Sequence, residues 1–185
     1  MKARRAIFVD RDGTLIAEKD YLHKPEQVQF IEGSITALKA AIEAGFVIVM
    51  VTNQSGVGRG YFSMADVEKV HERLAREMAM HQVSLLTIYV APEAPDLPSR
   101  GRKPSPQFLF DARDEYDIDL ARSYMIGDKL IDLECGWNAG VRKSILVRTG
   151  YGAKLEAAGL PPGAVVVDDL RAAIEWILRD ASRTA

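Results

Sequence analysis

The sequence predicts an α/β fold in which helices cover both faces of a parallel β-sheet. Strand-like apolar runs alternate with longer segments of helical spacing, and this alternation is typical of parallel sheets. A chain of 185 residues fills one well-packed domain and is too short for two ordinary ones, so we expect a single domain over 1–185. Its 48% hydrophobic and 27% charged residues are the composition of an ordinary globular protein.

Strands and helices are expected to alternate along most of the chain. Strands are expected at 6–9, 46–51, 87–90, 123–126, 144–147 and 165–167, and helices at 34–44, 64–81, from after Lys103-Pro104 to about 115, at 132–139 and at 169–179. We expect Ser34 to cap the first of these helices and Gly45 to end it. The second helix opens with the capping pattern Ser63-x-x-Asp66.

The segment 91–101, APEAPDLPSRG, interrupts this alternation. It holds three of the eight prolines of the chain, so a helix or strand is nearly excluded there. We predict a loop, and a loop of this length inside one domain is usually functional or disordered. It ends beside the basic pair Arg102-Lys103.

The stretch AIFVDRDGTL, residues 6–15, is the most informative part of the chain for chemistry. Its apolar strand delivers Asp10 and Asp12 onto a turn that Gly13 permits. In open parallel sheets ligands bind in the crevice beyond the carboxyl ends of the strands, which is where these carboxylates fall. Two carboxylates in one small cleft repel each other, and a hard divalent cation neutralises them most simply.

Three later strands also end in polar groups. They are Thr52, Asn53, Gln54 and Ser55 after the second strand, Arg102 and Lys103 beyond the third, and Gly127, Asp128, Lys129 and Asp132 after SYMI. Strand ends of a parallel sheet share one edge, so these groups are expected to meet at one site. Acids gather a metal, whereas a hydroxyl and cations suit a tetrahedral anion. The set favours phosphoryl transfer, in which catalysis is mainly positioning and charge neutralisation.

The two aspartates of the first motif are assigned different roles. Asp10 is the candidate nucleophile, whose carboxylate forms an aspartyl-phosphate that water then cleaves. Asp12 is the candidate general acid and base, which protonates the leaving oxygen and later deprotonates the attacking water.

Four motifs carry a family resemblance: DRDGT at 10–14, TNQSG at 52–56, RKP at 102–104 and GDKLID at 127–132. In this order they resemble the motifs of the haloacid dehalogenase (HAD) superfamily of phosphatases. The residues of these motifs are most similar to those of the D-glycero-D-manno-heptose-1,7-bisphosphate 7-phosphatases, whose relatives include histidinol phosphatases. The resemblance covers about residues 5–150 and implies a Rossmann-like HAD fold. No insertion large enough for a separate cap domain is visible after Asp12 or between the second and third motifs.

The resemblance implies a role for each matching residue. Catalysis is carried by Asp10, Asp12, Thr52 and Lys103, the last two holding the transferring phosphoryl group. Mg²⁺ is bound by Asp10, Asp128 and the backbone carbonyl of Asp12. The substrate is contacted by Thr52 and Lys103 and by Glu18, Lys19, Asp20, Tyr21, Asn53, Gln54, Ser55, Arg102 and Lys129. Asp132 is expected to orient Lys129 or a metal-bound water.

One departure from the family pattern concerns zinc. Many members carry a structural zinc loop, built from three cysteines and a histidine, between the third strand and the RKP motif. Here that interval reads YVAPEAPDLPSRGRKP and has no cysteine or histidine, so no zinc is expected. The single cysteine, Cys135, is expected to be a small buried residue. The altered loop borders the expected site and therefore bears on the choice of substrate.

Three classes of function are compared. The favoured one is a Mg²⁺-dependent phosphomonoester hydrolase that removes the 7-phosphate of heptose 1,7-bisphosphate, with histidinol phosphate or another small phosphorylated metabolite as the alternative substrate. A catalytically inactive phosphate-binding protein is disfavoured by Asp10, because Asn or Ser there would have removed the nucleophile. A phosphatase for nucleic-acid ends is disfavoured by the net charge of −2 and the 8% aromatic content.

Composition also limits the partners. The net charge of −2 implies no general attraction to nucleic acid or to an anionic membrane. No stretch approaches the ~20 apolar residues that span a bilayer, and the basic start of the chain reaches Asp10 before a signal-peptide apolar region is complete. We therefore expect a cytoplasmic enzyme that acts on a small phosphorylated metabolite, and the family resemblance suggests a monomer.

Overall fold

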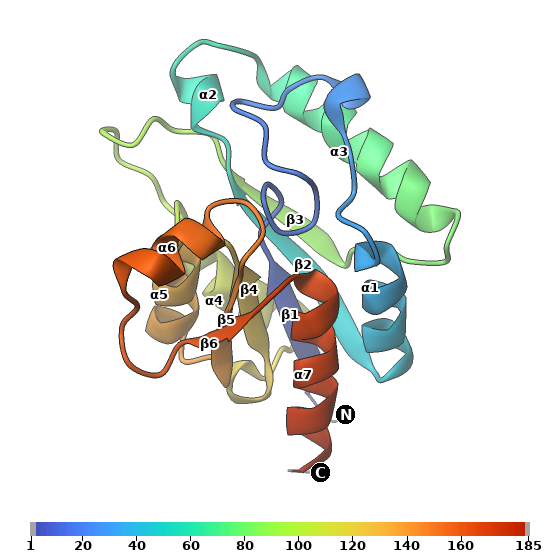
Figure 1. The fold of residues 1–185 in the computed structure, drawn as a ribbon. Helices are drawn as coiled ribbons and strands as arrows, with labels where there is room; N and C mark the ends of the chain where they lie inside the picture. The colour runs from blue at the N-terminus through green and yellow to red at the C-terminus, as the bar shows by residue number, and fades with distance from the viewer. Residues whose placement is uncertain (1–2, 184–185) are drawn as a thin grey trace.

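A computed structural model describes residues 3–183, so residues 1, 2, 184 and 185 of the expected domain lie outside the described part (Figure 1). Six parallel strands form one sheet in the order β3-β2-β1-β4-β5-β6. The strands are β1 (Arg5–Val9), β2 (Phe46–Asn53), β3 (Thr87–Ala91), β4 (Tyr124–Gly127), β5 (Lys143–Val147) and β6 (Val165–Val167). The predicted parallel α/β sheet is confirmed, with all six strands close to their expected positions.

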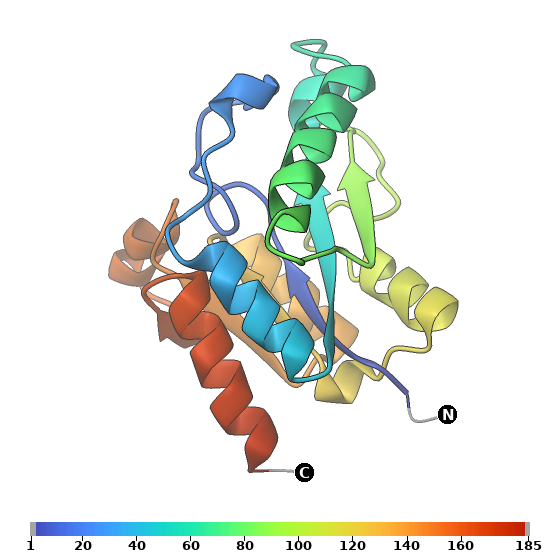
Figure 2. The same ribbon diagram turned by 90° about the vertical axis from the view of Figure 1, so that its right-hand side faces the viewer.

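Helices cover both faces of this sheet (Figure 2). They are α1 (Ser34–Glu43), α2 (Ser55–Gly58), α3 (Met64–Ala79), α4 (Gln107–Tyr116), α5 (Leu130–Ala139), α6 (Gly152–Ala158) and α7 (Leu170–Ser182), with 3-10 turns at Pro25–Gln27 and Leu120–Arg122. The cores of α1, α3 and α7 pack on one face, and those of α4 and α5 pack on the other. Within residues 3–183 no segment forms a large cap domain, as predicted.

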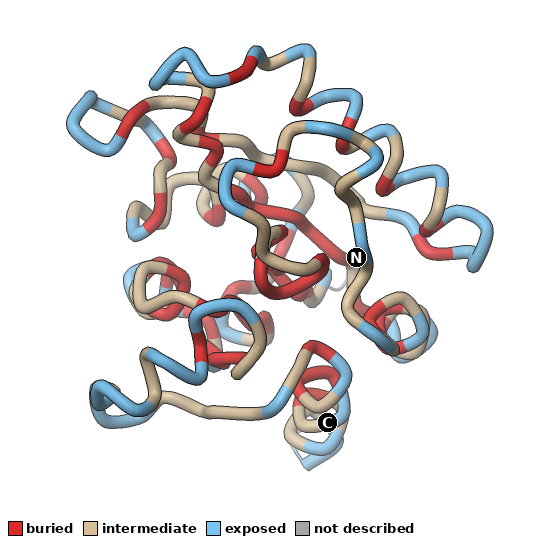
Figure 3. Tube along the Cα trace, turned by 45° about the horizontal axis from the view of Figure 1, so that its top comes forward, coloured by how far each residue is buried: buried red, intermediate tan, exposed pale blue. Residues whose placement is uncertain are grey.

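Strand β1 lies at the centre of the sheet and is buried on both sides (Figure 3). Ile7 and Val9 face the layer of α1, α3 and α7, whereas Ala6 and Phe8 face the layer of α4 and α5. A strand covered on both faces has no polar position, which explains its continuous apolar run. On one side of β1 the sheet continues through β2 and β3, and on the other side it continues through β4, β5 and β6. The strand order therefore reverses beside β1, which ends at a topological switch point.

The helix ends agree with the sequence in two places and differ in one. Gly45, in the left-handed region at φ 87°, follows the end of α1, and Ser63 and Asp66 form the predicted capping box of α3. Ser34 is not the cap of α1, which corrects our prediction. The chain enters this helix through left-handed Gly33, so Ser34 is already helical and its buried hydroxyl donates to the Leu15 carbonyl.

Two short helices were not expected. Helix α2 is a single turn with two glycines, and its propensity alone argues against a helix. It forms where β2 ends, because Gln54 N–H donates to the Ala91 carbonyl and Gly58 N–H donates to the Pro92 carbonyl. Helix α6 has seven residues and follows the end of β5. None of the described helices is long and apolar enough to cross a membrane.

Replacing Leu74 by alanine tests the packing of α3. Leu74 is fully buried against the sheet, so Leu74→Ala should lower the free energy of unfolding by about 2–5 kcal/mol in urea denaturation. The control is Glu72→Ala, which changes an exposed residue of the same helix and should shift the free energy of unfolding by less than about 0.5 kcal/mol. A Leu74→Ala loss no larger than the control's would contradict the packing of this helix.

Candidate active site

The predicted strand ends do converge. Asp10 follows β1, Thr52 lies at the end of β2, and Asp128 follows β4, so all three stand at the carboxyl edge of neighbouring strands. The Asp10 N–H still donates to the Ile126 carbonyl at 3.0 Å, which continues the ladder between β1 and β4. All three side chains are buried. The sheet therefore sets the backbone positions of these three residues.

Lys103 is the buried cation of this site. Its Nζ lies 2.6 Å from an oxygen of Asp10 and 2.6 Å from an oxygen of Asp132, and it donates to the Val51 carbonyl at 2.8 Å. Burial opposes the positive charge, but the carboxylates of Asp10 and Asp132 outweigh it and raise the pKa of Lys103 above its ordinary value. Lys103 is therefore a permanent cation beside the candidate nucleophile.

The backbone of Lys103 is held by Asn53. Lys103 N–H donates to Asn53 Oδ1 at 3.0 Å, and Asn53 Nδ2 donates to the Lys103 carbonyl at 3.2 Å. This two-way brace connects the end of β2 to the RKP segment. The sequence predicted substrate contact for Asn53, whose amide is committed to Lys103 while the residue also lines the cavity described below.

Asp10, Asp128 and Asp132 form a buried cluster in which one oxygen of each lies within 4.8 Å of the others. Burial, and after it the charge of Asp10, raises the pKa of Asp128 to about 7. Asp128 Oδ2 accepts the Tyr151 N–H at 2.9 Å, whereas its buried Oδ1 has no hydrogen-bond partner and lies 3.5 Å from Lys129 Nζ. An orphaned oxygen among three carboxylates fits a hard divalent cation, which prefers oxygen ligands.

Glycines keep this cluster open. A side chain on Gly13, which has φ 79°, would collide with the carboxylate of Asp128, and so would one on Gly150. Asp132 Oδ2 accepts the Lys129 N–H at 3.0 Å, so Asp132 orients the backbone of Lys129 and also pairs with Lys103. We predicted that Asp132 orients Lys129 or a metal-bound water, and the structure also places Asp132 in the acidic cluster.

The carboxylate of Asp12 lies outside the cluster of Asp10, Asp128 and Asp132. It accepts hydrogen bonds from Arg11 Nε at 3.0 Å, from Arg11 Nη2 at 3.2 Å and from Gln54 Nε2 at 3.0 Å. Gln54 Nε2 also donates to the hydroxyl of Thr52 at 2.8 Å. Asp12 lines the cavity, and its side chain is not in the cluster of three carboxylates. A metal contact through its backbone carbonyl stays a prediction.

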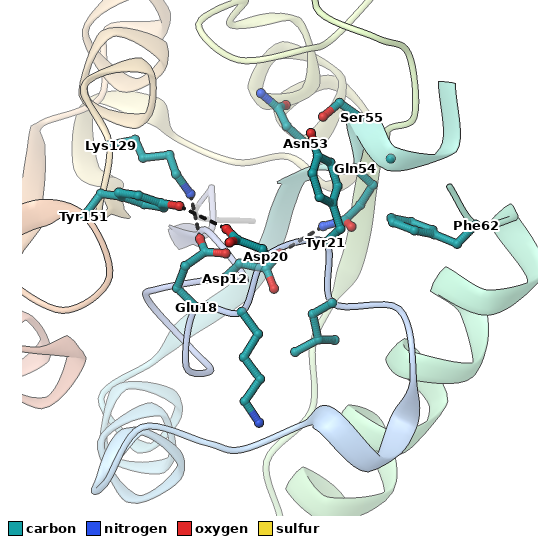
Figure 4. A pocket seen from close by; sticks show the side chains of 13 residues that line it. Asp12, Glu18, Asp20, Tyr21, Asn53, Gln54, Ser55, Phe62, Lys129 and Tyr151 are labelled. Atoms are coloured by element: carbon teal, nitrogen blue, oxygen red, sulfur yellow. Dashed lines mark hydrogen bonds and ion pairs between the residues drawn. The ribbon is translucent and has the colours of Figure 1, made fainter. Parts of the chain in front are cut away.

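A cavity of about 280 Å³ opens at this edge of the sheet (Figure 4). Eight of the predicted substrate or catalytic residues line it besides Asn53: Asp12, Glu18, Lys19, Asp20, Tyr21, Gln54, Ser55 and Lys129. Leu22, Gly56, Phe62 and Tyr151 also line it and were not predicted. Asp10, Thr52, Lys103, Asp128 and Asp132 are buried and Arg102 is half-buried, and none of these is among the residues that line it.

Lys129 crosses one side of the cavity. Its Nζ lies 3.0 Å from Glu18 Oε2 and 4.9 Å from the centre of the Tyr151 ring. Figure 4 shows the side chains of Lys129, Glu18 and Tyr151 close together on this side of the cavity. Burial opposes its charge, but carboxylates led by Asp10 raise the pKa of Lys129. Burial raises the pKa of Glu18, and the charge of Lys129 partly offsets this increase. The cavity thus combines a fixed cation with an aromatic ring and a carboxylate.

Two predicted substrate residues have other partners. Lys19 lines the cavity, but its Nζ donates to the Gln27 carbonyl at 2.7 Å and so closes its own loop. Arg102 donates from Nη1 to the Glu93 carbonyl at 3.2 Å. Burial, and next the charge of Arg59, lowers the pKa of Arg102. Substrate contact by either side chain stays a prediction.

The proline-rich loop is held by its own hydrogen bonds. Ser99 Oγ donates to Glu93 Oε2 at 2.6 Å and accepts the Arg102 N–H at 3.1 Å. A side chain on Gly58 of α2 would collide with the backbone of Ala94, so loop and helix are in close contact. The predicted loop is confirmed over 92–101, whereas Ala91 is the last residue of β3. Local polar contacts order this segment, which has no cysteine or histidine.

Sequence reasoning missed Arg11 and Tyr151. Arg11 lies between the two aspartates of the first motif and is completely buried. The sequence alone does not indicate that this charged residue is buried. Tyr151 follows the end of β5, and the rule used for the other strand ends would have found it. Cys135 is fully buried, as predicted, and its Sγ donates to the Ser105 carbonyl at 3.2 Å.

Family models match most of the chain. The polynucleotide kinase 3 phosphatase model matches residues 5–132, and the HAD-hydrolase-like model matches residues 101–173. Together with the parallel sheet and the acidic cluster at its carboxyl edge, these matches define a phosphatase of the HAD type.

Relatives narrow this class. The D-glycero-beta-D-manno-heptose-1,7-bisphosphate 7-phosphatase of Escherichia coli K12 is 41% identical over 156 residues, which are 80% of this chain and 82% of that protein. The enzyme of the same name from Yersinia pestis is 37% identical over 180 residues, which are 94% of this chain and 89% of that protein. The chain belongs to the family of these heptose bisphosphate phosphatases.

Solved structures agree with this family. The D,D-heptose 1,7-bisphosphate phosphatase of B. bronchiseptica, complexed with magnesium and phosphate, superposes with a TM-score of 0.88 at 35% identity, covering 96% of this chain and 99% of that chain. The enzyme from Burkholderia thailandensis gives a TM-score of 0.71 at 32% identity, covering 95% of this chain and 99% of that chain.

The raised pKa of Asp128 predicts a stability effect. Folded Asp128 holds its proton up to about pH 7 and the unfolded residue only up to about pH 4, so the buried carboxylate destabilises the cation-free fold increasingly as pH rises through this window. At pH 8 in EDTA, Asp128→Asn should therefore raise the free energy of unfolding by on the order of 1–2 kcal/mol.

Mg²⁺ provides the second half of this measurement. It should stabilise the wild-type protein in thermal unfolding and leave Asp128→Asn nearly unchanged, because the variant has lost a ligand charge. Asp114→Asn, an exposed change, is the control and should behave as wild type in both conditions. A variant less stable than wild type in EDTA would contradict the raised pKa of Asp128.

Proposed function

We propose that this phosphatase removes the 7-phosphate of D-glycero-β-D-manno-heptose 1,7-bisphosphate through an aspartyl-phosphate on Asp10. The observation that carries the mechanism is the buried contact between Lys103 and Asp10 beside Asp128, at the carboxyl end of β1. The names of the relatives support the substrate. The largely polar lining of the cavity supports a small, hydroxyl-rich ligand.

The site residues fit Mg²⁺. Asp10, Asp128 and the backbone carbonyl of Asp12 would hold it, and the orphaned Oδ1 of Asp128 supports this ligand set. When bound, the cation supplies neutralising charge for the phosphoryl oxygens. The relative from B. bronchiseptica, whose structure contains magnesium and phosphate, supports the choice of metal. No zinc is expected, because residues 89–104 offer no cysteine or histidine.

The first step transfers the phosphoryl group to Asp10. A carboxylate oxygen of Asp10 forms a bond to phosphorus while the ester P–O bond breaks. Asp12, which enters this step protonated, gives its proton to the departing alkoxide and becomes a carboxylate. Lys103, fixed beside Asp10, offsets the negative charge that gathers on the phosphoryl oxygens. The Thr52 hydroxyl accepts a hydrogen bond from Gln54, so its own hydrogen is available to that group.

The second step regenerates the enzyme. A water oxygen bonds to phosphorus, the bond between phosphorus and Asp10 breaks, and Asp12 takes the proton of the water. Inorganic phosphate leaves, and Asp10 is again a carboxylate paired with Lys103. The sum is one ester and one water converted to one alcohol and one phosphate. We further propose that the enzyme is a cytoplasmic monomer that binds neither nucleic acid nor membranes.

The nucleophile is tested by Asp10→Asn. This change keeps the shape of the side chain and removes the attacking carboxylate, so kcat should fall by about 10³-fold or more while the protein stays folded. Phosphate release and circular dichroism measure both properties. Asp96→Asn, an exposed change in the proline-rich loop, is the matched control and should retain full activity. Wild-type turnover by Asp10→Asn would refute the aspartyl-phosphate.

The substrate is tested by kcat/KM in the presence of Mg²⁺. Both anomers of heptose 1,7-bisphosphate are compared with histidinol phosphate, other sugar phosphates and an oligonucleotide bearing a 3′-phosphate, because one matching family model is that of a polynucleotide phosphatase. A heptose bisphosphate should be preferred by about a hundredfold, or roughly 2.7 kcal/mol of transition-state binding. Equal rates across the panel would refute this substrate, and preference for the oligonucleotide would replace it.

A further inference from the structure

Arg11 is a wholly buried cation that the mechanism has not used. Its relative exposure is 0%, and among the described residues it is the largest side chain that is fully buried. It is not among the residues that line the cavity, so it cannot contact a ligand there. A buried guanidinium is costly unless its donors are satisfied, so its partners show what it stabilises.

The guanidinium joins three segments of the cavity wall. Nε and Nη2 donate to the two oxygens of Asp12 at 3.0 and 3.2 Å, and Nη2 also donates to Gln54 Oε1 at 3.0 Å and to the Leu22 carbonyl at 3.2 Å. Gln54 Nε2 donates to Asp12 in turn, which closes a ring of hydrogen bonds. Asp12, Leu22 and Gln54 all line the cavity.

The remaining side of Arg11 faces His71 of α3. Its Nη1 lies 3.4 Å from His71 Nε2. Burial, and next the charge of Arg11, lowers the pKa of His71 to about 3, so the imidazole is neutral near pH 7 and its Nε2 can accept a hydrogen bond. Within residues 3–183 the ion pair of Arg11 is with Asp12. The positive charge is thus directed at one carboxylate.

We propose that Arg11 is a positioning residue that fixes the orientation of Asp12, the general acid of the proposed reaction. Contact with both oxygens by a rigid, planar fork sets the carboxylate plane as well as its place. Proton transfer requires that the donor stand within hydrogen-bond reach of the leaving oxygen, so a small rotation of Asp12 slows it. This inference rests on the proposed function, in which Asp12 protonates the leaving group.

Two substrates with different leaving groups test the proposal. Heptose 1,7-bisphosphate, the sugar phosphate of the proposed reaction, releases an alkoxide that needs the proton of Asp12. In contrast, p-nitrophenyl phosphate releases a phenolate that leaves without a proton. Because kcat/KM reports steps only up to departure of the leaving group, it isolates this proton transfer. Arg11→Lys keeps the charge but loses the fork, and should lower kcat/KM about 30-fold for the sugar phosphate and less than about threefold for p-nitrophenyl phosphate.

Further variants keep the test decisive. Arg11→Met should enlarge the selective loss, and Arg11→Lys serves alone if Arg11→Met fails to fold in circular dichroism. In an Asp12→Asn background, Arg11→Lys should cause no additional loss, because its effect passes through Asp12. Arg5→Met removes an arginine of β1 that stacks on Phe46 away from the cavity, and should match wild type.

The outcomes separate the two hypotheses. Equal losses on both substrates, or an undiminished effect of Arg11→Lys in the Asp12→Asn background, would overturn the positioning role of Arg11. If the wild-type protein with Mg²⁺ hydrolyses neither substrate, or if Asp10→Asn hydrolyses both, the proposed function itself fails. A selective loss with an active wild-type protein supports both.

Discussion

Mutual repulsion among Asp10, Asp128 and Asp132 is the constraint around which this site is arranged. Their oxygens approach within 4.8 Å of one another in a region almost closed to water, where charges interact strongly. Lys103 is inserted between two of them, and Lys129 stands beside the third. Burial, and after it the charge of Asp10, still keeps the pKa of Asp128 above its ordinary value. The cluster holds three carboxylates and two lysines. The residual negative charge gives the site its attraction for a cation.

The backbone around the cluster is shaped to allow this crowding. Gly13 and Gly150 leave room for Asp128 that no side chain could leave, and Asn53 holds the backbone of Lys103 so that its long side chain reaches Asp10. These residues are far apart in the sequence and meet because β1, β2 and β4 are neighbours. The sheet therefore supplies the positional accuracy, and the loops beyond it supply the chemical groups.

The sequence was informative where a local pattern carries the signal. Strands buried on both faces are continuous apolar runs, and the polar residues that follow them, such as Asp10 and Asp128, mark the edge of the sheet where ligands bind. Features that depend on distant partners were harder to predict. Helix α2 has two glycines and is created by contacts with the loop after β3. Arg11 was missed because its partners Leu22 and Gln54 come from other loops. Tertiary contacts of this kind leave no local pattern in the sequence.

The contact between α2 and the proline-rich loop also reaches the catalytic lysine. Glu93, Ser99 and Arg102 form a chain of hydrogen bonds that ends one residue before Lys103, and Lys103 is itself braced by Asn53. On its other side the loop meets α2, whose first residue lines the cavity. Here ordinary hydrogen bonds run from the loop to the cation beside the nucleophile, so the order of the loop and the placement of Lys103 belong to one network.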